Sequence, residues 1–382
     1  MLKVLIYLLF LFNTFYPNSV KAKNINNKEC STETSGLYLD IVFILDTSEN
    51  AAIFDIQRQK GITFQFVVIS NLSMDNKKLQ SSRISLITAS GEANVIGDLN
   101  AFTTDTELMG ALKSINSTRT DYKKLDIIKA LDAADDVIKS SGRSLNYKKL
   151  VVLYSSHEDI HCEENARIKN SLFDSDICRR AAEFKNNGYD LMTIRLDYEG
   201  KDPLNKNGIA SPCYSLDFND NIVENMLELA LKSNCYCDKT YFQFYDNDIC
   251  NKTAECIYLE STPAIYSVAE MIAKDVKAEL VDIKSESKQN FLLSLANNSV
   301  PFFIGLNQLE DNNTWKWDTG YSFNKNTDYN QFALGEEEKK GMCASLNFDS
   351  KWYAVNCTSY AVNEPYIYQK SACDTENFCS VY

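Results

Sequence analysis

Histidine is almost absent from this sequence: its 382 residues include two, His157 and His161. A three-histidine metal centre is therefore excluded, and catalysis that needs a histidine base is restricted to one segment. Positive charge is also scarce, because 39 Lys and Arg residues stand against 52 Asp and Glu, a formal net charge of −13. This balance excludes nucleic acid as a partner, since its phosphates require clustered Lys and Arg.

Long apolar runs are missing as well. Residues 4–12 are apolar, but a membrane span needs about 20 such residues. Lys3 precedes this run, and Val20-Lys21-Ala22 places small residues at the two positions that a signal peptidase reads. We therefore expect a signal peptide at residues 1–22 and a secreted, extracellular chain with no membrane span.

The modifications expected of a secreted chain can be read from its residues. The cysteines number 12, and in an oxidising compartment an even set indicates disulfide bonds. Five Asn-x-Ser/Thr sequons are candidate glycosylation sites: Asn71, Asn116, Asn251, Asn297 and Asn312. A sixth sequon, at Asn356, is disfavoured because its middle residue, Cys357, should be bonded and buried.

Strand-like and helix-like segments alternate between residues 37 and 232. Near-continuous apolar runs are typical of strands buried on both faces. Strands are expected at residues 37–45, 83–87, 150–154 and 190–196. Helical spacing appears at residues 53–69, 125–138, 177–184 and 222–231. The alternation predicts an α/β fold, doubly wound, with a mainly parallel sheet covered on both faces.

Polar residues follow the first strand as Asp46-Thr47-Ser48-Glu49-Asn50. In open α/β sheets ligands bind at the carboxyl ends of the strands, and Asp and Ser oxygens suit a hard cation such as Mg²⁺. This segment and the strand–helix order resemble a von Willebrand factor A domain. In that family the strand runs into Asp-x-Ser-x-Ser, and a Thr and an Asp from later loops complete a cation site.

The resemblance implies a degenerate cation site. Asp46 and Ser48 match the motif, but Asn50 replaces the second Ser. Thr118 or Thr120 takes the Thr position, and Ser156 stands in place of the later Asp. Because this replacement removes a carboxylate, we favour a loop without a cation, in which Asp46 caps the helix that follows. The alternative is a weak Mg²⁺ or Ca²⁺ site formed by Asp46, Ser48 and Thr120, and no other cofactor is expected.

From residue 235 the pattern changes to short, aromatic, loop-rich segments that contain all three Trp residues, with helical spacing at 267–276 and 285–295. Phe303-Ile304-Gly305-Leu306 is followed by Trp315-Lys316-Trp317, then by Cys343, Trp352 and Cys357. This order resembles the α+β C-type lectin-like domain, in which the aromatic residues pack the core and Gly305 sits where a side chain would clash. We expect the A-like domain at residues 23–234 and the lectin-like domain at 235–382.

In sugar-binding members of the lectin family, Ca²⁺ is held by Glu-Pro-Asn or Gln-Pro-Asp in a long loop and by a later Trp-Asn-Asp. Here Glu336 matches the first acid, but Glu337 and Glu338 replace the other two residues. The later segment reads Trp352-Tyr353-Ala354, so both of its oxygen ligands are absent. Since Ca²⁺ takes six to eight oxygens, we expect no calcium-dependent sugar binding here. Glu336 and Trp352 remain the candidate ligand-binding residues.

The same resemblance implies an inner loop bridge between Cys343 and Cys357. It also places Ala273 and Tyr368 where the family's long bridge would be, so both partners are lost together. Cys162 and Cys178 flank one loop-to-helix stretch and are expected to pair, and Cys373 and Cys379 to close a small loop. Cys235, Cys237, Cys250 and Cys256 are expected to staple the domain entrance. Either Cys30 or Cys213 is expected to bond into the Cys235/Cys237 pair.

Two functions of different class follow. The tandem order resembles a secreted family best known from nematodes, which implies an extracellular recognition protein, not an enzyme, that binds protein or carbohydrate ligands in innate defence. The alternative is a zinc-dependent hydrolase, because His157-Glu158-Asp159-Ile160-His161 meets the His-Glu-x-x-His pattern. The polar, loop-like context of that segment directly after a strand disfavours the hydrolase.

Overall fold

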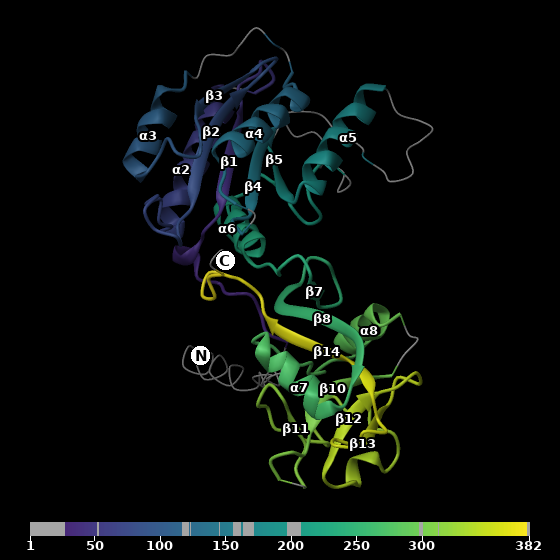
Figure 1. Ribbon diagram of the computed structural model, residues 1–382. Coiled ribbons are helices and arrows are strands. Elements are labelled where there is room, and N and C mark those ends of the chain that lie inside the picture. Colours follow the sequence, from purple (N-terminus) through teal and green to yellow (C-terminus); the bar gives the residue numbers. More distant parts are fainter. Residues whose placement is uncertain are drawn as a thin grey trace, which may run out of the picture.

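The computed structural model describes residues 27–51, 53–116, 122, 124–144, 146–155, 162, 172–196, 208–297, 301–311 and 313–379. The chain forms two domains, each built on its own sheet (Figure 1). Within the described ranges, no helix is both long enough and apolar enough to cross a bilayer. The signal peptide expected at residues 1–22 lies outside these ranges.

The first domain is an α/β domain with a mainly parallel sheet, as the alternation predicts. Its strand order is β3-β2-β1-β4-β5-β6, and β3 alone runs antiparallel to its neighbour. Every residue of the central strand β1 is buried, because helices cover both faces. The strands are β1 (Asp40–Asp46), β2 (Arg83–Ala89), β3 (Ala93–Gly97), β4 (Lys149–Ser155), β5 (Tyr189–Arg195) and β6 (Ser215–Asp217).

Two sets of helices enclose this sheet. On one face α2 (Ile53–Ser70), α3 (Asp105–Ser114) and α6 (Ile222–Asn234) pack against alternate residues of β1, including Phe43. On the other face α4 (Ile127–Ser141) and α5 (Leu172–Asn186) pack against Val42 and its neighbours (Figure 1). Alternate residues of β1 thus enter the cores on opposite faces of the sheet, which explains why the strand is one continuous apolar run.

Three elements of this domain, β3, α3 and β6, were not predicted from the sequence. β3 is an edge strand whose central residues are exposed, so it lacks the apolar run by which the other strands were found. Helix α3 did carry a usable signal. Thr104 and Glu107 form a reciprocal capping box at its start, the Ser/Thr-x-x-Glu pattern of a helix N-terminus.

The second domain has an α+β fold around a sheet of order β13-β12-β10-β14-β8-β7, with β11 on β10 and β9 on β14. Its core holds Trp315, Trp317 and Trp352. The helices are α7 (Tyr266–Asp275) and α8 (Glu286–Leu295), with a 3-10 turn at η2 (Glu336–Glu338); the other 3-10 turn, η1 (Thr34–Gly36), precedes β1 of the first domain. The strands are β7 (Phe242–Tyr245), β8 (Lys252–Ala264), β9 (Glu279–Leu280), β10 (Phe302–Asn307), β11 (Lys316–Trp317), β12 (Met342–Leu346), β13 (Trp352–Asn356) and β14 (Glu364–Ser371).

Gly305 on β10 lies against the backbone of β9, as expected from the sequence. A Cβ at this position would lie 2.4 Å from the carbonyl oxygen of Leu280. Replacing Gly305 by Ala is expected to destabilise the protein by about 1–3 kcal/mol, because a strand backbone must move to admit the methyl group. Denaturant unfolding measures this change.

Gly61 is the matched control for this prediction. It lies in α2 with nothing within 4 Å of an added Cβ, so Gly61→Ala should stabilise the protein by about 0.5–1 kcal/mol through helix propensity. Equal effects of the two substitutions would contradict the steric argument.

All twelve cysteines are joined in pairs, and none is free. Cys343–Cys357, Cys162–Cys178 and Cys373–Cys379 are the pairs that the sequence analysis favoured. Cys30 bonds to Cys235, one of the two alternatives left open, and Cys237 bonds to Cys256. Cys213 joins Cys250 rather than the Cys235/Cys237 pair. The last bond links a loop of the first domain to the β7–β8 turn of the second.

Both ends of the described chain hold the two domains together. Residues 372–379 leave β14 and return to the first domain, where the ring of Phe378 lies 4.9 Å from that of Tyr38 (Figure 1). Gln80 donates from Nε2 to the carbonyl oxygen of Thr375 at 2.6 Å. At the other end, Ala254 on β8 donates to the carbonyl oxygen of Lys28 at 2.7 Å. The two domains are therefore joined by packing and hydrogen bonds as well as by the connecting chain.

Candidate functional site

The carboxyl end of β1 positions the first candidate site. Asp46 and Ser48 are both fully buried. Gln59 on α2 clamps the backbone here, because its amide accepts from the N–H of Asp46 at 2.8 Å and donates to the carbonyl oxygen of Asp46 at 3.0 Å. The Asp46 carboxylate accepts the N–H of Ser48 at 2.9 Å. The turn therefore brings a carboxylate and a hydroxyl together.

The hydroxyl of Ser48 has no hydrogen-bond partner among the described residues. Leaving such a buried group unsatisfied costs about 1–3 kcal/mol, so water or an ion normally occupies a position of this kind. Together with the Asp46 carboxylate, it fits a hard cation with oxygen ligands. A bound cation would be held by these two side chains and would supply a positive charge for an acidic group of a partner. Thr118, Thr120 and Ser156 lie outside the described residues.

Trp352 belongs to the core, and its prediction as a ligand-binding residue is wrong. Its side chain is fully buried, and its indole N–H donates to the side-chain oxygen of Gln289 at 2.8 Å. The ring packs edge-on against Trp317, with ring centres 5.6 Å apart, and against Phe332. A side chain enclosed in this way has no surface left for a ligand.

Glu336, which the resemblance places at the first calcium-binding acid, lies at the start of η2, and its carboxylate reaches β13. Its two carboxylate oxygens lie 2.7 and 2.8 Å from the ammonium of Lys339. The second oxygen also accepts the backbone N–H of Ala354 at 2.9 Å. A side-chain cation and a strand N–H thus occupy three of the about four acceptor sites with which the Glu336 carboxylate would hold a metal ion. Tyr353, the next residue after Trp352, donates its hydroxyl to Asp349 instead.

Ala273 and Tyr368, placed by the resemblance where a long bridge would be, share one buried cluster. Of the candidate glycosylation sites, four asparagines are exposed and Asn312 lies outside the described residues. The exposed asparagines are Asn71, Asn116, Asn251 and Asn297.

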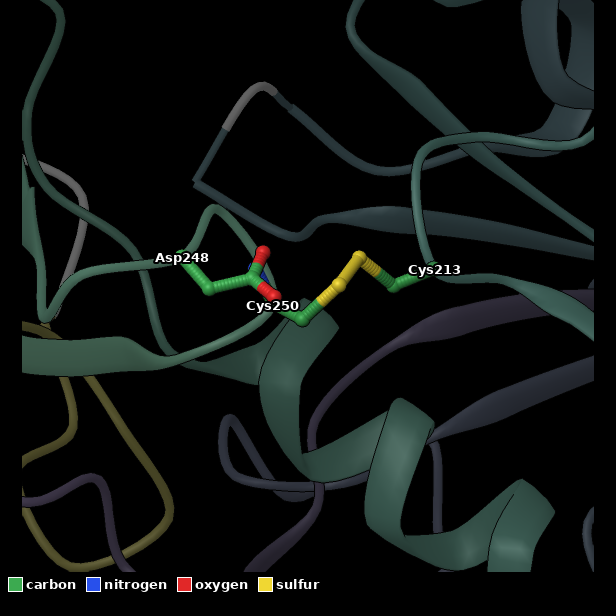
Figure 2. A group of neighbouring side chains, drawn as sticks. All are labelled: Cys213, Asp248 and Cys250. Atoms are coloured by element: carbon green, nitrogen blue, oxygen red, sulfur yellow. A yellow bond between two sulfur atoms is a disulfide. The ribbon is translucent and has the colours of Figure 1, made fainter.

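One group of potential metal-ligating side chains occurs among the described residues: Cys213, Asp248 and Cys250. Figure 2 shows the two sulfur atoms joined to each other with the carboxylate of Asp248 beside them. That carboxylate accepts the N–H of Cys250 at 3.0 Å, which closes the turn. Because a disulfide carries no thiolate, this group is a structural cross-link. The zinc-binding alternative cannot be located here, since His157, Glu158 and His161 lie outside the described residues.

Comparisons with known proteins match the two domains to two different families. The family model "von Willebrand factor type A domain" matches residues 40–236, and the model "Lectin C-type domain" matches residues 265–363. The Caenorhabditis elegans "C-type lectin domain-containing protein 160" is 24% identical over 383 residues, which cover 92% of this chain and 56% of that protein.

Other similar proteins match the second domain. Human "C-type lectin domain family 6 member A" is 30% identical over 96 residues, 25% of this chain and 45% of that protein. The chain therefore spans about half the length of the curated relatives that it matches. Among solved structures, the mouse scavenger receptor C-type lectin carbohydrate-recognition domain is 22% identical with a TM-score of 0.29, covering 36% of this chain and 98% of that one.

Proposed function

Since the chain belongs to the von Willebrand factor A domain family and carries a C-type lectin domain behind that domain, we propose that it is a secreted protein that recognises protein or glycan ligands without coordinating them through calcium. The two domain types support an extracellular recognition role and indicate no enzyme family. The finer part of the proposal, calcium independence, rests on the long loop of the lectin domain.

One observation carries that part: the carboxylate of Glu336 is engaged by Lys339 and by the N–H of Ala354. For Ca²⁺ to bind here, it would have to displace the ammonium and recruit further oxygens. The neighbouring Ala354 offers none from its side chain, and the hydroxyl of Tyr353 is bonded to Asp349. The loop also exposes an apolar residue, Leu334, which suits contacts that do not involve a metal ion. These observations favour direct contacts between loop side chains and the ligand over coordination of the ligand by Ca²⁺.

The test is a glycan and protein-ligand screen performed with calcium and with a chelator. We expect the same ligands and the same affinities in both conditions, and no calcium-induced rise in melting temperature that is lost in Glu336→Gln. A calcium site saturated about 100-fold above its Kd would instead stabilise the protein by about 2.7 kcal/mol.

The variant Glu336→Gln distinguishes a loop that binds no calcium from a loop that holds a calcium ion. Its loss of the Lys339 pair should cost about 1 kcal/mol of stability with or without calcium, since the pair is partly exposed. Glu338→Gln, at a more exposed pair with Lys325, is the control. Calcium-dependent stability that vanishes in Glu336→Gln alone would overturn the proposal.

The proposal extends to a setting in innate defence and to glycans on the exposed asparagines. The six disulfides and the exposure of Asn71, Asn116, Asn251 and Asn297 support an extracellular, glycosylated protein. A mass shift of the secreted protein on treatment with a glycosidase tests the glycan part. The zinc hydrolase remains the alternative, and stoichiometric zinc that is lost in His157→Ala would favour it.

A further inference from the structure

A cavity of about 700 Å³ lies between the two domains. On the first domain it is bordered by the starts of β4 and β5 and by α6, and on the second by β7 and β8 (Figure 1). Asp46 lies at the carboxyl end of β1, the opposite end of the parallel sheet, and Glu336 does not line the cavity. The cavity is thus separate from both candidate sites described above. Its volume is within the range of small-molecule sites.

The lining of this cavity is positively charged in a protein whose net charge is −13. Five lysines and two aspartates line it. Asp238 is paired with Lys370 outside the lining, and Lys232 is paired with Glu228. Asp190 is therefore the one lining carboxylate left to face the other lysines. These are Lys148, Lys185, Lys239 and Lys252.

Three of these lysines are half-buried and lack a carboxylate within ion-pair distance among the described residues: Lys148, Lys185 and Lys252. Lys252 donates to the carbonyl oxygen of Lys232 at 2.8 Å, and Lys185 to that of Ala210 at 3.2 Å. The ammonium of Lys148 lies 4.9 Å from the ring centre of Tyr236. Because an ammonium has three N–H groups, each of the three can still donate to an anion.

Burial makes these charges costly without a counter-ion. Burial lowers the pKa of Lys252 to about 8. The nearby charge of Lys148 lowers this pKa further, and that of Asp190 raises it. Burial lowers the pKa values of Lys148 and Lys185 as well. An anion in the cavity would raise these pKa values again by favouring the charged forms.

Aromatic side chains complete the lining. Tyr245 has an apolar ring with a hydroxyl, and Phe242 is more than half exposed. Such side chains can contact the faces of a sugar ring while donating to its hydroxyl groups. We propose that this interdomain cavity binds an acidic saccharide, whose sulfate or carboxylate groups contact Lys148, Lys185 and Lys252 and whose ring lies against Tyr245 and Phe242.

The cavity should bind less well as the pH rises. Lys252 must be protonated to hold an anion, and its charge is lost as the pH rises through about 8. Burial raises the pKa of Tyr245, so it stays neutral in this range. Affinity should therefore fall between about pH 7 and pH 9 in the native protein. The charged groups that line the cavity with Lys252 are Asp190 on β5, Lys148 before β4, Lys185 on α5, Lys232 on α6, and Asp238 and Lys239 before β7.

Calorimetric titration of the full chain with a sulfated uronate–glucosamine disaccharide tests the site. We expect one site per chain, and a loss of affinity of about tenfold or more in Lys148→Gln/Lys252→Gln, because two charge-assisted contacts are removed. Lys77→Gln/Lys113→Gln makes the same change of net charge at exposed positions and should bind as the native protein does. The pH dependence should also weaken in Lys252→Gln, because the lysine with a pKa of about 8 is removed.

Two further probes define the ligand class. The unsulfated disaccharide and inorganic sulfate should each bind more weakly than the sulfated sugar. Sulfate binding as tightly as the sulfated sugar would overturn the saccharide assignment. No binding by the native protein, or equal binding by both double variants, would overturn the site. Near-ultraviolet circular dichroism confirms that the variants are folded. A ligand of the lectin loop should bind Lys148→Gln/Lys252→Gln unchanged, so this test and that of the proposed function fail independently.

Discussion

Replacing Lys288 by Met is expected to lower the free energy of unfolding by about 3–5 kcal/mol, because it removes the ammonium partner of buried Glu255 and leaves Asp282 paired with Lys284 alone. Lys288 on α8 is fully buried. Its ammonium lies 2.6 Å from Asp282 and 2.8 Å from Glu255, and it also donates to Gln369 at 2.8 Å. These partners come from three separate segments of the second domain. Methionine fills the space of the lysine stem but pairs with none of them.

The pH dependence identifies the cause of this loss. Burial by itself raises the pKa of Asp282, but the ammonium groups of Lys288 and Lys284 outweigh it and hold that pKa well below its usual value. A lowered folded-state pKa stabilises the native protein above the unfolded pKa of about 4, and this stability is lost as the pH falls through the folded value. In Lys288→Met the Asp282 carboxyl takes up a proton more readily. The stability gap between variant and native protein should therefore narrow on acidification.

Denaturant unfolding at neutral pH and at about pH 4 measures both effects. Lys274→Met is the matched control, since Lys274 is mostly exposed and pairs with Glu270 one turn away on α7. Its loss should cost about 0.5 kcal/mol or less. A deficit in Lys288→Met no larger than that of the control, or one that does not change with pH, would show that the buried network does not stabilise this domain.

Removing the Cys30–Cys235 disulfide is the second large effect, expected to cost up to about 5 kcal/mol. The bond joins residues 205 positions apart, and a cross-link that closes a long loop removes the most conformational entropy from the unfolded chain. It also fixes the segment before β1, where Glu29 pairs with Thr253 of β8. The double variant Cys30→Ser/Cys235→Ser is used so that no free thiol remains.

Cys373→Ser/Cys379→Ser is the control, because its loop spans a separation of 6 residues. The same entropy argument gives about 2 kcal/mol for it. Denaturant unfolding under non-reducing conditions, with the remaining bonds mapped by mass spectrometry, compares the two. A larger loss for the short loop would contradict the entropic account and point to packing around Phe378 instead.

Much of the fold could be predicted because its signals are local. The buried run before Asp46 and the helical stripe of residues 125–138 correspond to β1 and α4, since strand and helix periodicities are properties of neighbouring residues. The Gly305 prediction also holds, because a short apolar strand with a central glycine marks a close backbone approach. Local signals fail at edge elements such as β3, which bury little.

The candidate sites were harder to predict because exposure is not local. Trp352 occupies the motif position expected near a ligand, yet the rings of Trp317 and Phe332 enclose it. Glu336 was found from its motif, but its engagement by Lys339 and Ala354 depends on how the loop folds back onto β13. Sequence indicates which residue type stands at a position, and only packing decides whether a ligand can reach it.

The sequence by itself determined that two modules stand in tandem, that their cysteines suit disulfides, and that the residues at Asn50, Glu337 and Ala354 depart from the cation-site motifs of the two families that the chain resembles. These are statements about neighbouring residues and residue types. Only the tertiary structure decided that Cys30 pairs with Cys235, that Cys213 ties one domain to the other, and that Lys148, Lys185 and Lys252 line one cavity. The reason is physical: these residues are far apart along the chain, and their proximity arises only when both sheets have formed and docked.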